Sequence, residues 1–135
     1  MQLNKITESQ LQIAFFEYCR TRSKYEPEWG MIFAIPMQGG SGRVNMIRSA
    51  KMKLEGASRG VPDFFVAVPR GKSSGLFVEL KLPSGTLSPE QKAWQEKLTK
   101  QGYVSSVIKT EDVLTVIRHV EDYFADRTIK TSTPS

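Results

Sequence analysis

The sequence contains few of the residues that stabilise small exported proteins or hold structural metal ions. Among 135 residues there is one cysteine, Cys19, and one histidine, His119. A single cysteine cannot form an internal disulfide, and no cluster of cysteines and histidines exists to bind a structural zinc ion. We therefore expect an intracellular protein whose core is stabilised by burial alone.

Long apolar runs are also missing. No run approaches the roughly 18 residues that a membrane span requires, and the N-terminal residues 1–6 lack the apolar core of a signal peptide. We expect a cytoplasmic protein without membrane contact. The length fits one domain, which we place at residues 1–125, followed by a tail at 126–135 that we expect to be disordered.

Positive charge is present and unevenly placed. The chain carries a net charge of +5, and one segment between residues 43 and 60 holds five basic residues against a single acid, Glu55. Such a segment suits a polyanion, because neutralised phosphates release counterions. A solvated helix face explains the same pattern equally well. The basic residues are Arg43, Arg48, Lys51, Lys53 and Arg59.

The order of apolar patterns predicts an α/β protein. Thr7 and Gln10 form a capping-box signature, and Leu11, Phe15 and Cys19 follow at helical spacing, so a helix is predicted at 7–22. The other predicted elements are a strand at 31–35, a helix over 44–56, strands at 63–68 and 76–81, a helix at 88–101, a strand at 103–109 and a final helix capped by Thr110.

Two acids and a lysine fall on the two predicted strands that form a hairpin. Side chains alternate across a strand, so Glu79 and Lys81 share a face. If the loop closes symmetrically, Val68 faces Leu76, which places Asp63 opposite Lys81 and diagonal to Glu79. In that register the two carboxylates can share one cation.

Carboxylate oxygens suit Mg²⁺ or Mn²⁺, and a lysine beside them can orient a water or neutralise charge on a phosphate. The alternative is structural: Asp63 begins a strand after a turn, and Glu79 forms an ion pair with Lys81 on an exposed sheet. Against the alternative, the rest of the strand at 76–81 is strongly apolar, where charge is costly without a partner.

Two further polar residues have double interpretations. Glu8 falls on the helical stripe of Leu11 and Phe15, where it needs a partner, but it also lies in a first helical turn, where it can stay solvated. Gln91 can complete a capping box with Ser88, and it also lies on the helix face turned toward the sheet. Capping is the safer interpretation of Gln91.

Six short motifs follow one another along the chain. They are Glu-Ser-Gln-Leu-Gln at 8–12, Phe-Ala-Ile-Pro at 33–36, Gly-Val-Pro-Asp at 60–63, Gly-Leu-Phe-Val-Glu-Leu-Lys at 75–81, Leu-Ser-Pro-Glu-Gln-Lys-Ala-Trp at 87–94 and Gln-Gly-Tyr at 101–103. In this order, the motifs closely resemble the VRR-NUC domain, a branch of the PD-(D/E)xK nuclease superfamily, in the compact stand-alone form of bacteriophages and prophages. The resemblance covers roughly residues 7–120.

The resemblance implies a restriction-endonuclease-like core, in which a mixed central β-sheet is flanked by α-helices. It further implies that Asp63, Glu79 and the carbonyl of Leu80 bind the metal, that Lys81 is the catalytic lysine, that Glu8 completes the site and that Gln91 supports it. Stand-alone members are similar to Holliday-junction resolvases, so a homodimer acting on branched DNA is expected, in the bacterial host cell if a phage encodes it.

One departure from the family is visible. Many members have asparagine after the Ile-Pro pair, where this chain has Met37. The departure bears on the DNA contacts expected at Gln38 and Ser41 in the glycine-rich loop, and not on the metal site.

Three functional classes compete on these observations. A metal-dependent, structure-specific DNA endonuclease accounts for the acids, Lys81 and the basic segment. A non-catalytic nucleic-acid-binding module accounts for the charge alone, and a protein-interaction domain accounts for neither. Having only His119, the chain is a poor candidate for histidine-dependent nuclease chemistry.

Overall fold

Helices and strands alternate along the chain, as predicted. The computed structural model describes residues 5–36 and 43–127, with the backbone alone at 43–45. The predicted loop at 38–42 lies outside the described residues, and so does the predicted tail apart from Asp126 and Arg127. The elements are α1 (Glu8–Arg22), a 3-10 helix η1 (Pro27–Met31), β1 (Ile32–Ala34), α2 (Arg43–Leu54), β2 (Phe64–Val66), β3 (Leu76–Lys81), α3 (Pro89–Lys100), β4 (Val104–Lys109) and α4 (Val113–Phe124).

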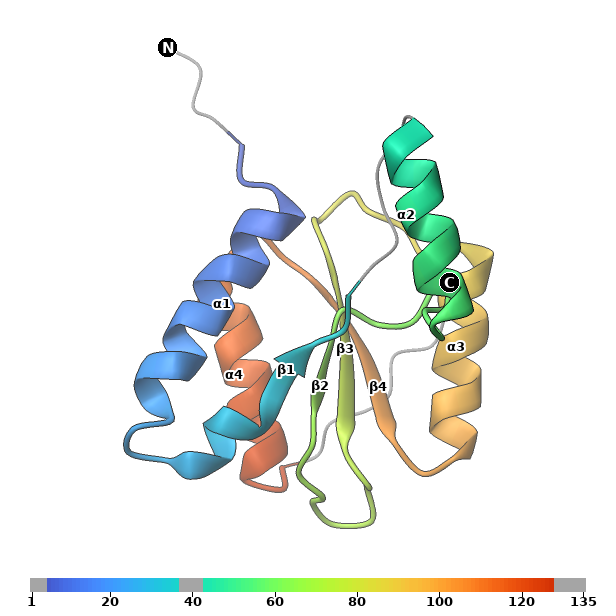
Figure 1. Cartoon of the computed structure of the whole chain (residues 1–135). Coiled ribbons are helices and arrows are strands. Elements are labelled where there is room, and N and C mark those ends of the chain that lie inside the picture. The colour runs from blue at the N-terminus through green and yellow to red at the C-terminus, as the bar shows by residue number, and fades with distance from the viewer. Residues whose placement is uncertain (1–4, 37–42, 128–135) are drawn as a thin grey trace.

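Within the described residues, four strands form one mixed sheet in the order β1-β2-β3-β4 (Figure 1). The first three strands are antiparallel, and β4 runs parallel to β3, with α3 as the crossover between them. Helices α1 and α4 pack together beside one face of the sheet, and α3 lies on β4. The predicted α/β class with a helix-flanked mixed sheet is confirmed.

Capping explains where three helices begin. Thr7 and Ser88 each form the predicted capping box, with Gln10 and Gln91 respectively. The predicted cap of the last helix is wrong: the N-cap is Asp112, whose Oδ1 accepts a hydrogen bond from the Leu114 amide at 3.0 Å. The Thr110 hydroxyl accepts from the amide of Asp112 instead, and thereby holds the turn that precedes the helix.

The hydrophobic core lies between the sheet and the pair α1 and α4. Alternate residues of the central strands point into it, as the period of two requires. A fully buried set links these layers: Leu11, Phe15, Phe64, Val66, Leu76, Val78, Val116 and Val120. The residues between them on β3, including Glu79 and Lys81, therefore point to the opposite face.

The predicted register of the hairpin is wrong by two residues. Val66, not Val68, lies opposite Leu76, and Phe64 lies opposite Val78. Extending the ladder by one residue places Asp63 opposite Glu79. Because the shift is even, every side chain keeps its predicted face. The correction brings the two acids closer than the symmetric loop would allow.

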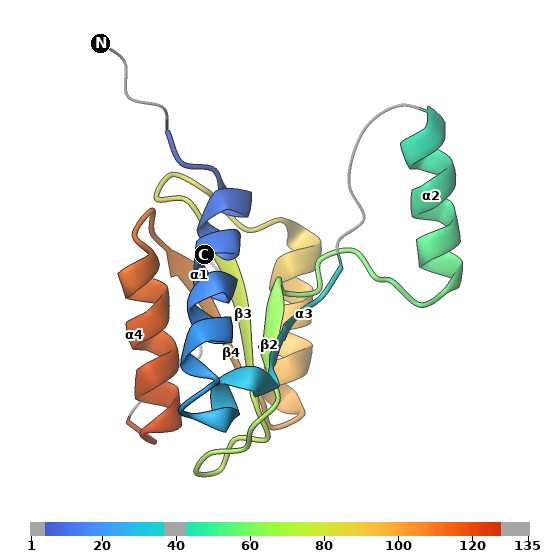
Figure 2. The ribbon, with the colours of Figure 1, turned by 60° about the vertical axis from the view of Figure 1, so that its left-hand side comes forward.

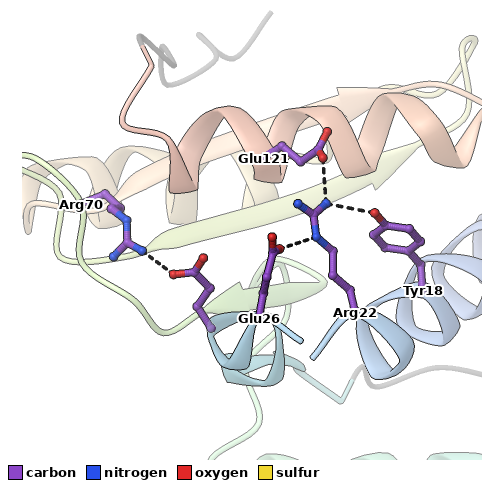
Figure 3. Close-up of polar contacts among 6 residues, drawn as sticks. Tyr18, Arg22, Glu26, Arg70 and Glu121 are labelled. Carbon is purple, nitrogen blue, oxygen red and sulfur yellow. Dashed lines mark hydrogen bonds and ion pairs between the residues drawn. The ribbon is translucent and has the colours of Figure 1, made fainter. Parts of the chain in front are cut away.

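A network of ion pairs fixes the end of the sheet that carries the β2–β3 loop (Figure 3). The Arg22 guanidinium at the end of α1 donates to Glu26 and to Glu121 of α4, the latter at 2.7 Å. Arg70 of the loop donates to Glu28 at 2.6 Å. These contacts connect α1, η1, α4 and the β2–β3 loop at the end of the sheet remote from Asp63. They therefore stabilise the end of the sheet opposite the one where the two acids lie.

Helix α2 stands apart from the rest of the protein (Figure 2). On a helical wheel, Met46, Ile47 and Leu54 fall within one arc of about 100°, and these side chains are 69%, 64% and 90% exposed. The helix therefore presents an apolar stripe to solvent. Among the described helices, none combines the length and apolarity that crossing a membrane demands.

Candidate active site

The structure brings Asp63, Glu79 and Lys81 together where β2 begins. Asp63 directly precedes β2, and its Oδ2 accepts a hydrogen bond from the Leu80 amide of β3 at 2.7 Å. The Lys81 ammonium lies 4.0 Å from Glu79 Oε2. The two carboxylates and the ammonium thus occupy one face of neighbouring strands, held by the ladder between β2 and β3.

Burial makes this pair of acids electrostatically unusual. Glu79 is only 5% exposed, and its Oε1 has no hydrogen-bond partner among the described residues. Burial first, and the neighbouring Asp63 second, raise the pKa of Glu79 to about 9. Burial also raises the pKa of Asp63, although the hydrogen bond from Leu80 opposes the rise. Both shifts oppose the placing of two negative charges on this pair.

The Leu80 carbonyl is directed toward the same edge as the acids. The N–H and C=O of one strand residue point to the same side, and the N–H of Leu80 points to Asp63. The next carbonyl, that of Lys81, points the other way and accepts from the Thr110 amide of β4. The backbone is therefore consistent with the predicted ligand at Leu80.

Glu8 lies at the mouth of a cleft that also includes Asp63. It is the first residue of α1 and is exposed, so it is not packed on the core stripe. The cleft has a volume of about 550 Å³ and runs between α1 and the end of β1. The negative charge of Glu8 contributes to the raised pKa values of both Asp63 and Glu79, which places it within electrostatic reach of the pair.

Two roles were predicted for Gln91, and the structure shows the capping role. Its Oε1 accepts from the Ser88 amide at 2.8 Å. Gln95, which no predicted motif included, is the buried glutamine of α3: it is 3% exposed, and its Nε2 donates to the Ser105 carbonyl at 3.0 Å. The sequence does place Gln95 four residues after Gln91, on the same face of the helix, and this spacing could have indicated that Gln95 also faces the sheet.

The predicted DNA-binding residues are only partly described. Gln38 and Ser41 lie outside the described residues, as does the side chain of Arg43. The remaining basic residues are exposed on α2 or in the loop that follows it, and Lys51 contacts Glu55 at 3.9 Å. Those exposed residues are Arg48, Lys51, Lys53 and Arg59.

The donor set determines which metal could fit. Within residues 5–36 and 43–127, no three side chains of histidine, cysteine, aspartate or glutamate gather into a ligand cluster. Asp63, Glu79 and the Leu80 carbonyl are all oxygen donors, and Asp63 lines the cleft beside α1. This is the pattern of Mg²⁺ sites, which retain several waters and use one or two carboxylates. The buried Oε1 of Glu79, which has no hydrogen-bond partner among the described residues, is an oxygen donor of the type that a hard cation prefers.

Comparisons with known proteins bear on the family and the fold of the chain. The family model of the VRR-NUC domain matches residues 7–112. A solved structure of a VRR-NUC domain protein superposes with a TM-score of 0.74 and 26% identity, covering 98% of this chain and 100% of that one. No match was found among curated proteins. The helices α1 to α4 and the mixed sheet therefore form an α/β fold of the restriction-endonuclease-like type.

Proposed function

Because the chain belongs to the VRR-NUC domain family, a nuclease-type family, we propose that it is a divalent-metal-dependent endonuclease that hydrolyses phosphodiester bonds in branched DNA. The buried pair Asp63–Glu79 is the single observation that carries the proposal. Two neighbouring carboxyl groups with raised pKa values are costly to the fold, and a cation between them would offset that cost.

Asp63, Glu79 and the Leu80 carbonyl would hold Mg²⁺ or Mn²⁺, with Glu8 at the open side. When bound, the metal polarises the scissile phosphate and lowers the pKa of the attacking water. The β2–β3 ladder fixes the spacing of the two acids, and the Leu80 amide orients the Asp63 carboxylate. The protein thus supplies a preorganised set of oxygen donors.

Lys81 supplies the positive charge of the site. Its side chain is 14% exposed, so its ammonium is shielded from bulk water and its charge acts strongly on nearby groups. Placed 4.0 Å from Glu79, it can neutralise charge that develops on the phosphoryl oxygens or orient the attacking water. Gln91 supports the site from α3, through the cap that fixes the start of that helix.

The proposal also specifies the substrate, branched DNA, and the oligomeric state, a homodimer. A four-way junction has two strands to cut, and two copies related by a twofold axis present two sites. The apolar stripe of α2 (Met46, Ile47 and Leu54) supports a protein partner, for which we take a second copy, and the exposed basic residues of α2 support contact with phosphates. Light scattering should detect a dimer, and Leu54→Glu should convert it to a monomer that still melts cooperatively.

Cleavage of labelled four-way junction, flap and linear duplex DNA in Mg²⁺ or Mn²⁺ tests the activity. Asp63→Asn and Lys81→Ala should each reduce cutting by at least about 100-fold, because the first removes a metal ligand and the second removes the cation that acts on the reacting phosphate. Lys109→Ala is the matched control, since Lys109 is the exposed neighbour of Lys81 on β4.

If the intact protein binds these DNAs but never cuts them, and the variants bind equally well, the catalytic proposal fails. The non-catalytic nucleic-acid-binding module is then the better account.

A further inference from the structure

The cleft beside Asp63 extends along α1 as a groove. Its lining residues on that helix recur at three- and four-residue spacing, so they form one stripe that faces β1. The stripe begins at Glu8 and ends at Arg20, which at ~1.5 Å per residue gives a length of about 18 Å. We call this the α1–β1 groove; its other wall is Ala34, Ile35 and Pro36.

We infer that the α1–β1 groove binds an unpaired DNA strand that continues from the phosphate held at Asp63. The inference rests on the proposed nuclease function and specifies its substrate: a strand that is single beside the scissile bond. At the ~3.4 Å spacing of stacked nucleotides, the groove covers about five of them, and fewer if the strand is extended.

The walls of the groove fit bases rather than a duplex. Ile13 is 55% exposed, and it lines the groove together with Phe16 and the pair Ile35 and Pro36. In a duplex the faces of the bases are stacked on one another. A protein can therefore contact only the phosphates, the sugars and the edges of the bases. Apolar and aromatic walls contact bases only when the strand is unpaired.

Phe16 is held rigidly in this wall. Its ring lies edge-on to Phe15 at 5.5 Å and to Phe64 at 5.7 Å between centroids. Phe64 is the residue after Asp63, so the aromatic wall and the metal-binding edge belong to one packed unit. A base placed against Phe16 is therefore at a fixed distance from the site of cleavage.

Arg20 supplies the charge at the far end. It is exposed, lines the groove, and forms no ion pair within the part of the chain that the structure describes. The other charged residues of the groove are Glu8, at the opposite end of the α1 stripe, and Asp63, which is within electrostatic reach of Glu8; a cation is expected to offset both. The groove thus has a cation site at one end and a guanidinium at the other, which suits a strand with a phosphate at each position.

Binding of fluorescein-labelled oligothymidine, followed by anisotropy in EDTA, tests the groove without any cleavage. Arg20→Ala should weaken binding about fivefold and make its salt dependence shallower by about one phosphate contact. Ile13→Glu should weaken binding at least as much, because it places an anion against the strand. Arg118→Ala, the matched removal of an exposed arginine from α4, should bind like the intact protein. Equal binding by all four proteins, or an equal loss with Arg118→Ala, overturns the inference.

Cleavage separates this inference from the nuclease proposal. The intact protein should cut DNA with splayed strands in preference to continuous duplex, and Arg20→Ala should reduce that preference about fivefold. If the intact protein cuts but Arg20→Ala leaves the preference unchanged, the groove assignment is wrong and the nuclease stands. If nothing is cut while Arg20→Ala and Ile13→Glu still lose oligothymidine, the groove stands and the nuclease proposal fails.

Discussion

Replacing Glu79 by glutamine should make the metal-free protein more stable. Burial and the charge of Asp63 raise the pKa of Glu79 from 4.5 to about 9, so between these pH values the folded state binds more protons than the unfolded chain. The free energy of unfolding then falls as pH rises, by about 1.4 kcal/mol per pH unit. Glu79 costs the folded state about 1 kcal/mol at pH 5.5 and about 4 kcal/mol at pH 7.5 on this basis.

Glutamine has nearly the same shape and stays neutral at both pH values, so it removes this cost. In EDTA at pH 7.5, circular dichroism should show the melting temperature of Glu79→Gln raised on the order of 10 °C above that of the intact protein, and the gain should be much smaller at pH 5.5. Glu96→Gln, an exposed substitution on α3, should change little at either pH. A variant less stable than the intact protein, or a gain that does not depend on pH, would refute the reasoning.

Three other substitutions make further tests. Two of them concern close packing at glycines, and the third concerns the titration of His119. A β-carbon at residue 85 would lie 3.2 Å from Lys81 Cβ, so Gly85→Ala should lower kcat on the order of tenfold with little change in KM; unchanged kcat contradicts this. Gly60 has a φ of +90° and packs on the backbone of Glu90, so Gly60→Ala should destabilise by about 1–3 kcal/mol, and an unchanged melting curve would oppose that view. Burial lowers the pKa of His119, so stability should fall as pH drops below about 6.5. His119→Gln should flatten that part of the pH profile, and an equal slope in both proteins would exclude the effect.

Local patterns in the sequence were enough to predict α1 to α4 and the strands β1 to β4, but not the 3-10 helix η1, which takes up Met31 at the start of the strand predicted at 31–35. The capping boxes at Thr7 and Ser88 and the alternation along β3 depend only on neighbours in the chain. The cap at Asp112 was missed because Thr110, two residues earlier, is also a capping residue by type, although its hydroxyl is used in the preceding turn. Choices of this kind depend on the path of the backbone and not on residue type.

The residues of the site were predicted correctly as a group on one face of two strands, but the register between those strands, β2 and β3, was not. The hairpin closes asymmetrically, with an isolated bridge between Arg70 and Ser73, so the strands are displaced by two residues from the symmetric arrangement. No pattern in the loop predicts that displacement. Gln95 and the groove ending at Arg20 were missed for a related reason, since each is defined by what a helix packs against. The isolation of α2 likewise appears only once the rest of the core is seen to close without it.

Binding of Mn²⁺ tests the central claim most directly, because Asp63 and Glu79 are proposed to hold the metal and must lose their protons to do so. Mn²⁺ is followed by electron paramagnetic resonance, and proton release by calorimetry in buffers of different ionisation enthalpy. The account predicts that the intact protein binds Mn²⁺ at pH 7.5 with release of about one proton, more weakly at pH 6. Glu79→Gln should lose both the binding and the proton. Equal Mn²⁺ binding by the intact protein and Glu79→Gln, with no proton released, would contradict it.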